Sequence, residues 1–143
     1  MRRSKLVIIF TTAVLLNVTQ LLSQESNIAK LTGVWEIEGT LMGDNGEGWL
    51  MPHKPKNPDC ETKDHVVFKE GGKAFEVFYS SECAENRKEY DWKLDENQII
   101  LSKSDVSKPM LLHKVDGDQL ILGLRPRPGS DKWMYVRYKK IEE

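Results

Sequence analysis

Five acidic residues crowd one polar stretch of the chain, where metal chemistry would be most plausible. They are Asp44, Glu47, Asp59, Glu61 and Asp64. A calcium loop needs oxygen ligands at alternating positions and a closing glutamate, and that spacing is absent here. These side chains are therefore expected to be solvated loop charges, and we predict no metal site.

Groups that could act in acid–base or nucleophilic catalysis are scattered along the chain. They are His53, His65, His113, the Ser80–Ser81 pair, and the acidic residues Glu85, Glu89 and Asp91. A nucleophile needs an adjacent base that a third group orients, and no spacing here predicts that arrangement. The acidic residues are typical of an outward strand face. We expect no catalytic residue, no enzymatic activity and no cofactor.

Cys60 and Cys83 are the two cysteines of the chain. In an exported protein such a pair favours one disulfide, which contributes about 3 kcal/mol by restricting the unfolded chain. One alternative is a metal site that recruits a histidine, but the tight ligand spacing of such sites is missing. Another is a catalytic thiolate, which requires a free cysteine beside a base.

The N-terminal segment has the layout of a secretory signal peptide. Basic residues at positions 2, 3 and 5 precede an apolar run from Leu6 to Leu16, and a polar stretch follows. The run is shorter than the roughly 20 residues of a membrane span, although a retained anchor is the alternative. We predict cleavage near Ser23/Gln24, which leaves residues 24–143 as one domain. Because no cysteine lies near the cut, we expect a periplasmic or secreted protein that is not a lipoprotein.

The charge of the mature domain argues against one class of partner. The chain has 21 basic and 22 acidic residues, and residues 1–23 contain three of the basic ones and none of the acidic ones. Cleavage therefore leaves a net charge of about −4, which is unfavourable for binding nucleic acid.

Eight short segments of the predicted domain alternate between apolar and polar residues or are rich in β-branched and aromatic ones, as strands are. Turn sequences such as Gly71-Gly72 and Asp116-Gly117 separate them, and one helical turn is expected at residues 26–30. The predicted strands are residues 33–38, 65–69, 74–79, 87–94, 98–102, 110–115, 119–124 and 132–141. Residues 42–64 form the longest irregular stretch.

Short connections make neighbouring strands antiparallel, and closing the sheet removes its exposed edges. Eight strands enclose a space that side chains can fill or that can hold one small ligand. We therefore predict an all-β fold, an eight-stranded antiparallel up-and-down β-barrel, in preference to an open sandwich.

An ordered set of weak motifs resembles the lipocalin-like family, in particular its small exported bacterial proteins. The residues that carry the resemblance are Gly33-Val34-Trp35, Cys60 with Lys63-Asp64, Phe68, Gly71-Gly72, Cys83, Tyr90-Asp91-Trp92, Leu94, Asn97, Ile99-Ile100-Leu101 and Met134-Tyr135-Val136-Arg137-Tyr138. The resemblance covers nearly all of residues 28–141. It implies a barrel closed at one end, with Trp35 plugging that end and Arg137 packing across its ring. These two residues are assigned to structural closure.

Aromatic residues and one apolar triplet provide the candidate ligand site. The loop that follows the first strand contains Trp49-Leu50-Met51, and we expect this triplet to act as a lid that dips into the barrel mouth. The predicted lid and lining residues are Trp49, Leu50, Met51, Phe68, Phe78, Tyr90 and Trp92. The favoured function is binding or carrying a small hydrophobic molecule. The alternative is a structural or protein-interaction module whose barrel is filled by its own side chains.

Overall fold

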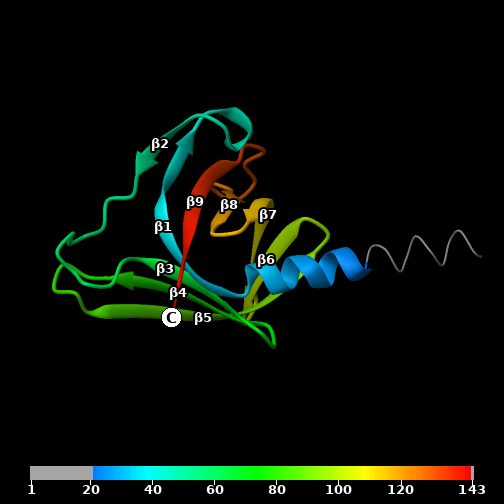
Figure 1. The fold of residues 1–143 in the computed structure, drawn as a ribbon, viewed down its shortest axis with the longest axis horizontal. Coiled ribbons are helices and arrows are strands. Elements are labelled where there is room, and N and C mark those ends of the chain that lie inside the picture. Colours follow the sequence, from blue (N-terminus) through cyan, green and yellow to red (C-terminus); the bar gives the residue numbers. More distant parts are fainter. Residues whose placement is uncertain (1–20, 143) are drawn as a thin grey trace, which may run out of the picture.

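The computed structural model of the chain describes residues 21–142, and its main feature is an antiparallel sheet that closes into a barrel (Figure 1). The strands are β1 (Gly33–Met42), β2 (Trp49–Pro52), β3 (His65–Lys69), β4 (Lys73–Tyr79), β5 (Glu85–Asp95), β6 (Gln98–Lys103), β7 (Val106–Asp116), β8 (Gln119–Leu124) and β9 (Met134–Ile141). A short 3-10 turn, η1 (Asp44–Gly46), lies between β1 and β2. The eight predicted strands are all present, and β2 is an additional one.

Closure of the barrel depends on β1, which pairs with β9 on one edge and with β3 on the other. The first half of β1 pairs with β3, and its second half pairs with β2 on that same edge. A register shift between Ile37 and Gly39 marks an irregularity in the pairing of β1 with β9. The result is a closed eight-stranded antiparallel barrel, and β2 extends the wall beyond it.

The closed end of the barrel is sealed by the chain that precedes β1. Residues 21–31 are helical, a longer element than the single turn expected at residues 26–30. Leu31 is fully buried, and its carbonyl accepts a hydrogen bond of 2.7 Å from the indole Nε1 of Trp35. Residues 1–20 of the predicted signal peptide lie outside the described residues, and the predicted cleavage site falls within the helical segment.

The cation that lies over the ring of Trp35 is not the predicted Arg137. Trp35 has no exposed surface, but the cation over its ring is Lys140, whose Nζ lies 5.2 Å from the ring centroid. Arg137 instead donates a 2.7 Å hydrogen bond from Nε to Glu38. The register explains the difference, because Trp35 pairs directly with Lys140, whereas Arg137 pairs with Gly39 beyond the irregularity in β1. Side chains of directly paired residues share one face of the sheet.

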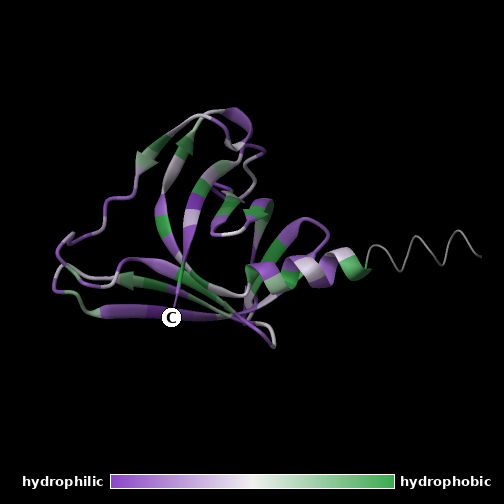
Figure 2. Ribbon diagram, viewed as in Figure 1, coloured by the Kyte–Doolittle hydropathy of each residue, from purple (hydrophilic) through white to green (hydrophobic). Residues whose placement is uncertain are grey.

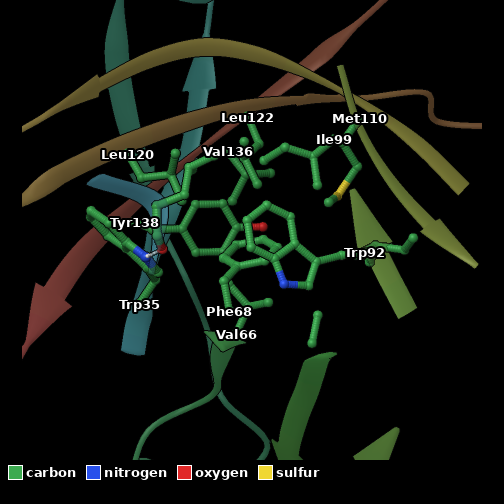
Figure 3. Packing of buried hydrophobic residues seen from close by; sticks show 13 residues of the cluster. Trp35, Val66, Phe68, Trp92, Ile99, Met110, Leu120, Leu122, Val136 and Tyr138 are labelled. Carbon is green, nitrogen blue, oxygen red and sulfur yellow. Dashed lines mark hydrogen bonds between the residues drawn. The ribbon is translucent and has the colours of Figure 1, made fainter. Parts of the chain in front are cut away.

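Large apolar side chains fill the closed half of the barrel (Figure 3). Phe68 and Trp92 meet edge to face, with ring centroids 5.1 Å apart, a geometry that aromatic rings favour. The indole of Trp92 donates to the carbonyl of Lys69 at 3.0 Å. The buried members of the cluster are Leu31, Trp35, Val66, Phe68, Ala74, Trp92, Ile99, Leu101, Met110, Leu120, Leu122, Val136 and Tyr138.

A second apolar cluster packs on the outer face of the barrel wall. Its buried residues are Leu41, Ile121 and Tyr135, with Leu50, Leu111 and Trp133 packed against them. Alternation along the strands requires this outer position, because Ile121 lies between two residues of the interior cluster. Gly46 of η1 lies close above, since a Cβ at this position would come within 3.1 Å of the rings of His113 and Tyr135. Trp133 and Tyr135 therefore pack on the outside of the barrel wall.

Candidate functional site

A small cavity lies inside the barrel against the interior cluster, five of whose residues line it. Its volume is about 20 Å³, which is room for about one water-sized group. Most of the wall is apolar, with Ile37, Met110 and Leu122 contributing from three different strands. Three polar residues, His65, Glu76 and Tyr138, also line it. An apolar space with a few polar groups is the usual composition of a small-molecule site.

Glu76 is a carboxylate on the inner face of the barrel wall. It pairs directly with Val66 of β3, whose side chain belongs to the interior cluster. Glu76 forms an ion pair with Lys108, and it accepts a hydrogen bond of 3.0 Å from the hydroxyl of Tyr90. The Glu76 side chain is 17% exposed, whereas that of Lys108 is 42% exposed. The carboxylate is thus largely withdrawn from water, and its counter-ion reaches it from the solvent side.

Tyr138 extends into the interior beside this charge. Figure 3 shows its ring in the middle of the apolar cluster with the hydroxyl directed into the barrel. The residue is 7% exposed, and its hydroxyl forms no hydrogen bond with any residue in the range 21–142, so this oxygen is not fully buried and faces the cavity. Burial, followed by the negative charge of Glu76, raises the pKa of Tyr138. The same two causes, with the hydrogen bond to Glu76, raise the pKa of Tyr90 to about 12.

The arrangement can bind a polar group. A carboxylate can accept about four hydrogen bonds, and Glu76 receives two from Lys108 and Tyr90. Glu76 therefore has acceptor capacity left, and the Tyr138 hydroxyl can donate or accept. Among the described residues, no group of three or more His, Cys, Asp or Glu side chains gathers in a way that could hold a metal ion.

Two kinds of interaction, a disulfide and hydrogen bonds to Asp64, hold the loop between β2 and β3 at the open end of the barrel. The disulfide Cys60–Cys83 joins it to the β4–β5 connection, which confirms the predicted bond. Asp64 accepts hydrogen bonds of 2.9 Å from the backbone N–H of Tyr79 and of 2.7 Å from the His53 ring. Asp64 is only 5% exposed, so the expectation that it is a solvated loop charge was wrong.

The apolar triplet that we expected to act as a lid is a strand. Leu50 pairs with Leu41 and packs on the outer cluster, so it does not enter the barrel mouth. Met51 pairs with Thr40, which pairs with Val136 of the interior cluster. Trp49 and Met51 therefore share the inward face of the wall, but they are 65% and 43% exposed. They extend the rim of the open end and do not cover it, and Figure 2 shows apolar residues on this hairpin.

The other predicted ligand residues divide into two groups. Phe78 lines the cavity and is 39% exposed, while Tyr90 contributes through its hydrogen bond to Glu76. Phe68 and Trp92 do not line the cavity but pack against each other in the filled half of the barrel. The structure thus brings Phe78 and Tyr90 close to the cavity and leaves Phe68 and Trp92 as core residues.

Sequence reasoning missed Glu76, Lys108 and Tyr138. In β4, both Ala74-Glu76-Phe78 and Phe75-Val77-Tyr79 include aromatic residues, so alternation alone did not reveal which set faces inward. The only available indication was a charged residue between Ala74 and Phe78. Phe75 lies outside, where the guanidinium of Arg87 stacks 3.8 Å from its ring centroid.

A surface groove of about 420 Å³ adjoins the barrel wall where β2 and β3 diverge. The loop after β2 forms one side through His53, Pro55 and Pro58, and β1 forms the other. Ile37 lines both this groove and the interior cavity. One β1 residue therefore separates the interior cavity from a larger space open to solvent.

Comparison with known protein families identifies the family to which this barrel belongs. The profile of the lipocalin-like domain matches residues 31–120, which is more than half of the chain. The chain belongs to the lipocalin-like family. The match includes Trp35, both cysteines, Glu76, Tyr90 and Lys108, and it ends before Tyr138. No curated protein and no solved structure gives a significant match.

Membership of the lipocalin-like family suggests the binding of small ligands, and its members are generally non-catalytic binding proteins. Within residues 21–142, no helix is long and apolar enough to cross a membrane.

Proposed function

We propose that this lipocalin-like domain binds a small, largely apolar molecule at the open half of its barrel. The observation that supports this most is the interior cavity, where apolar side chains surround Glu76 and the Tyr138 hydroxyl. The cavity of about 20 Å³ is smaller than typical ligand sites of about 300–1,000 Å³. A larger molecule therefore enters only when side chains at the rim move aside, and the partly exposed Phe78 and Lys108 have solvent to move into.

Native mass spectrometry of protein purified from its own host tests this function, together with calorimetric titration of hexanol as a minimal apolar probe. We expect a co-purifying small molecule, and saturable binding of hexanol. Ile37→Phe places additional bulk beside the cavity and should abolish that binding. Ile141→Phe adds the same bulk at the closed end and should leave it intact. If no small molecule co-purifies and hexanol does not bind, the barrel is a filled scaffold and the proposal fails.

Export to an oxidising compartment is a second part of the proposal. The disulfide Cys60–Cys83 supports it, because such bonds persist in secreted and periplasmic proteins. The N-terminal basic and apolar pattern also supports it. N-terminal sequencing of the mature protein should give Gln24 or a residue close to it. A mature chain that retains Met1 would contradict cleavage.

Interaction with another protein is the alternative function, and β2 is the feature that favours it. This strand pairs with β1 only, so its other edge is unpaired within the described residues. Unpaired edges are templates for strand addition, and Trp49 and Met51 are exposed there. Trp49→Ser with Met51→Ser should weaken capture of such a partner while hexanol binding stays unchanged. Unchanged capture of the partner together with loss of hexanol binding would favour ligand binding in the cavity as the function.

A further inference from the structure

We infer that the preferred ligand has an apolar body and one protonated amine, and that this amine replaces the Lys108 ammonium on Glu76. The inference rests on the proposed binding function and names the chemistry of that same site. It follows from three features of the cavity: a largely buried carboxylate, a counter-ion that can leave, and an uncommitted hydroxyl.

The Glu76 carboxylate determines the sign of charge that the site accepts. Glu76 is 17% exposed and lines the cavity. A carboxylate in such surroundings is costly unless a cation or hydrogen-bond donors accompany it. A ligand carboxylate placed in the same cavity would add a second negative charge, which is unfavourable. A fatty acid is therefore the wrong ligand for this space, although its apolar chain would suit the walls.

The counter-ion is exchangeable because it comes from the solvent side. The side chain of Lys108 is 42% exposed while its ammonium pairs with Glu76. A lysine with this exposure can rotate into water at little cost in solvation. A ligand ammonium can then take its place, so that the buried negative charge keeps one positive partner throughout. This exchange also removes the Lys108 side chain from the space beside the cavity.

The hydroxyl groups complete the recognition of an amine. An ammonium has three donors, of which Glu76 can accept one or two. The Tyr138 oxygen, directed into the interior (Figure 3), can accept another. The Tyr90 hydroxyl is already committed as a donor to Glu76 and stabilises the carboxylate in both states. The apolar body then lies against Ile37, Met110 and Leu122.

Another lysine near the site provides a matched control. Lys88 is the direct β5 partner of Glu76, so the two side chains share one face. Lys88 is exposed, and the described contacts include no ion pair between it and Glu76. Removing Lys88 changes the net charge as removal of Lys108 does, but it leaves the competing ammonium in place.

Calorimetric titration of hexylamine, hexanol and hexanoate at neutral pH, where the amine is protonated, tests the inference. For the wild-type protein we expect hexylamine to bind about tenfold more tightly than hexanol, the factor that about 1.4 kcal/mol corresponds to, and hexanoate to bind most weakly. Glu76→Gln should remove the preference for the amine. Lys108→Met should tighten amine binding about tenfold by removing the competitor, and Lys88→Met should not.

The outcomes separate the two proposals. If hexanol binds but hexylamine binds no better, and Lys108→Met leaves amine affinity unchanged, the amine inference fails while the binding function stands. If none of the three probes binds, the binding function itself fails. Circular dichroism checks that each variant is folded. If Glu76→Gln does not fold, the comparison of Lys108→Met with Lys88→Met still decides the question.

Discussion

The two ends of the barrel differ in how completely their side chains are packed and hydrogen-bonded. At the closed end Trp35 is fully buried, its indole is hydrogen-bonded to Leu31, and a lysine lies over its ring. At the open half a tyrosine hydroxyl without a partner among the described residues, a carboxylate and a partly exposed lysine lie at a small cavity. The closed end is built as a core is built, to maximise packing. The open half retains polar capacity that packing does not use, which is typical of a binding site.

The largest difference in stability is expected between substitutions of two tryptophans, one at each end of the barrel. Trp35→Ala should lower the free energy of unfolding by about 3–5 kcal/mol, because it removes a fully buried ring and leaves a cavity. Trp49→Ala should change it by about 0.5 kcal/mol or less, because that side chain is 65% exposed. Urea denaturation followed by circular dichroism measures both. Equal losses for the two variants would contradict the contrast.

The disulfide is the main covalent constraint at the open end. Replacing both cysteines with serine should cost about 3 kcal/mol, since the bond closes a loop with a sequence separation of 23 residues. The same loss should appear when the wild-type protein is denatured in the presence of a reductant. A double variant as stable as the oxidised protein would show that Asp64 and its hydrogen bonds alone hold the loop.

Two tyrosines in the same cavity region should respond differently to loss of their hydroxyl. Tyr90→Phe removes a hydrogen bond to a charged group. It should lower the free energy of unfolding by about 1 kcal/mol, a figure that already takes the partial exposure of the site into account. Tyr138→Phe removes a hydroxyl without a partner among the described residues and should cost less than about 0.5 kcal/mol. Thermal denaturation at neutral pH resolves the two. A larger loss for Tyr138→Phe would mean that its hydroxyl is committed to the fold.

The smallest expected effect is a loss of folding stability at alkaline pH. An unfolded tyrosine ionises near pH 10, whereas the folded-state pKa is raised for Tyr138 and raised to about 12 for Tyr90. The unfolded chain therefore releases protons first, so stability is fully present below about pH 10 and is lost as the pH rises toward 12. Tyr138→Phe should reduce this loss in a series of denaturation curves. An identical pH dependence in wild type and variant would refute the role of Tyr138.

The barrel itself was predictable from sequence because its strands carry local patterns. Trp35 and Ile37 alternate with acidic residues, and the turn sequences Gly71-Gly72 and Asp116-Gly117 mark two hairpins. The eight strands and their antiparallel order therefore followed from near neighbours. The strand Trp49–Pro52 was not recognised, because four residues ending in proline carry too little periodicity and β1 alone pairs with it.

The site was harder to predict because it depends on register and on which face of a strand turns inward. Glu76 and Lys108 are 32 positions apart in sequence, and only the pairing of β4 through β7 brings them together. The cation over Trp35 was assigned to Arg137 and proved to be Lys140, because Lys140 is the direct β9 partner of Trp35. The sequence alone does not reveal which residues of two neighbouring strands are paired.

A nuclear magnetic resonance titration with hexylamine tests whether the open half of the barrel receives a ligand beside Glu76. We expect saturable shifts concentrated at the amides of the cavity strands, near Ile37, Glu76, Met110 and Tyr138. The same titration of Glu76→Gln should require a much higher amine concentration. Shifts confined to β2 around Trp49, or no saturable shifts at all, would show that no ligand binds beside Glu76.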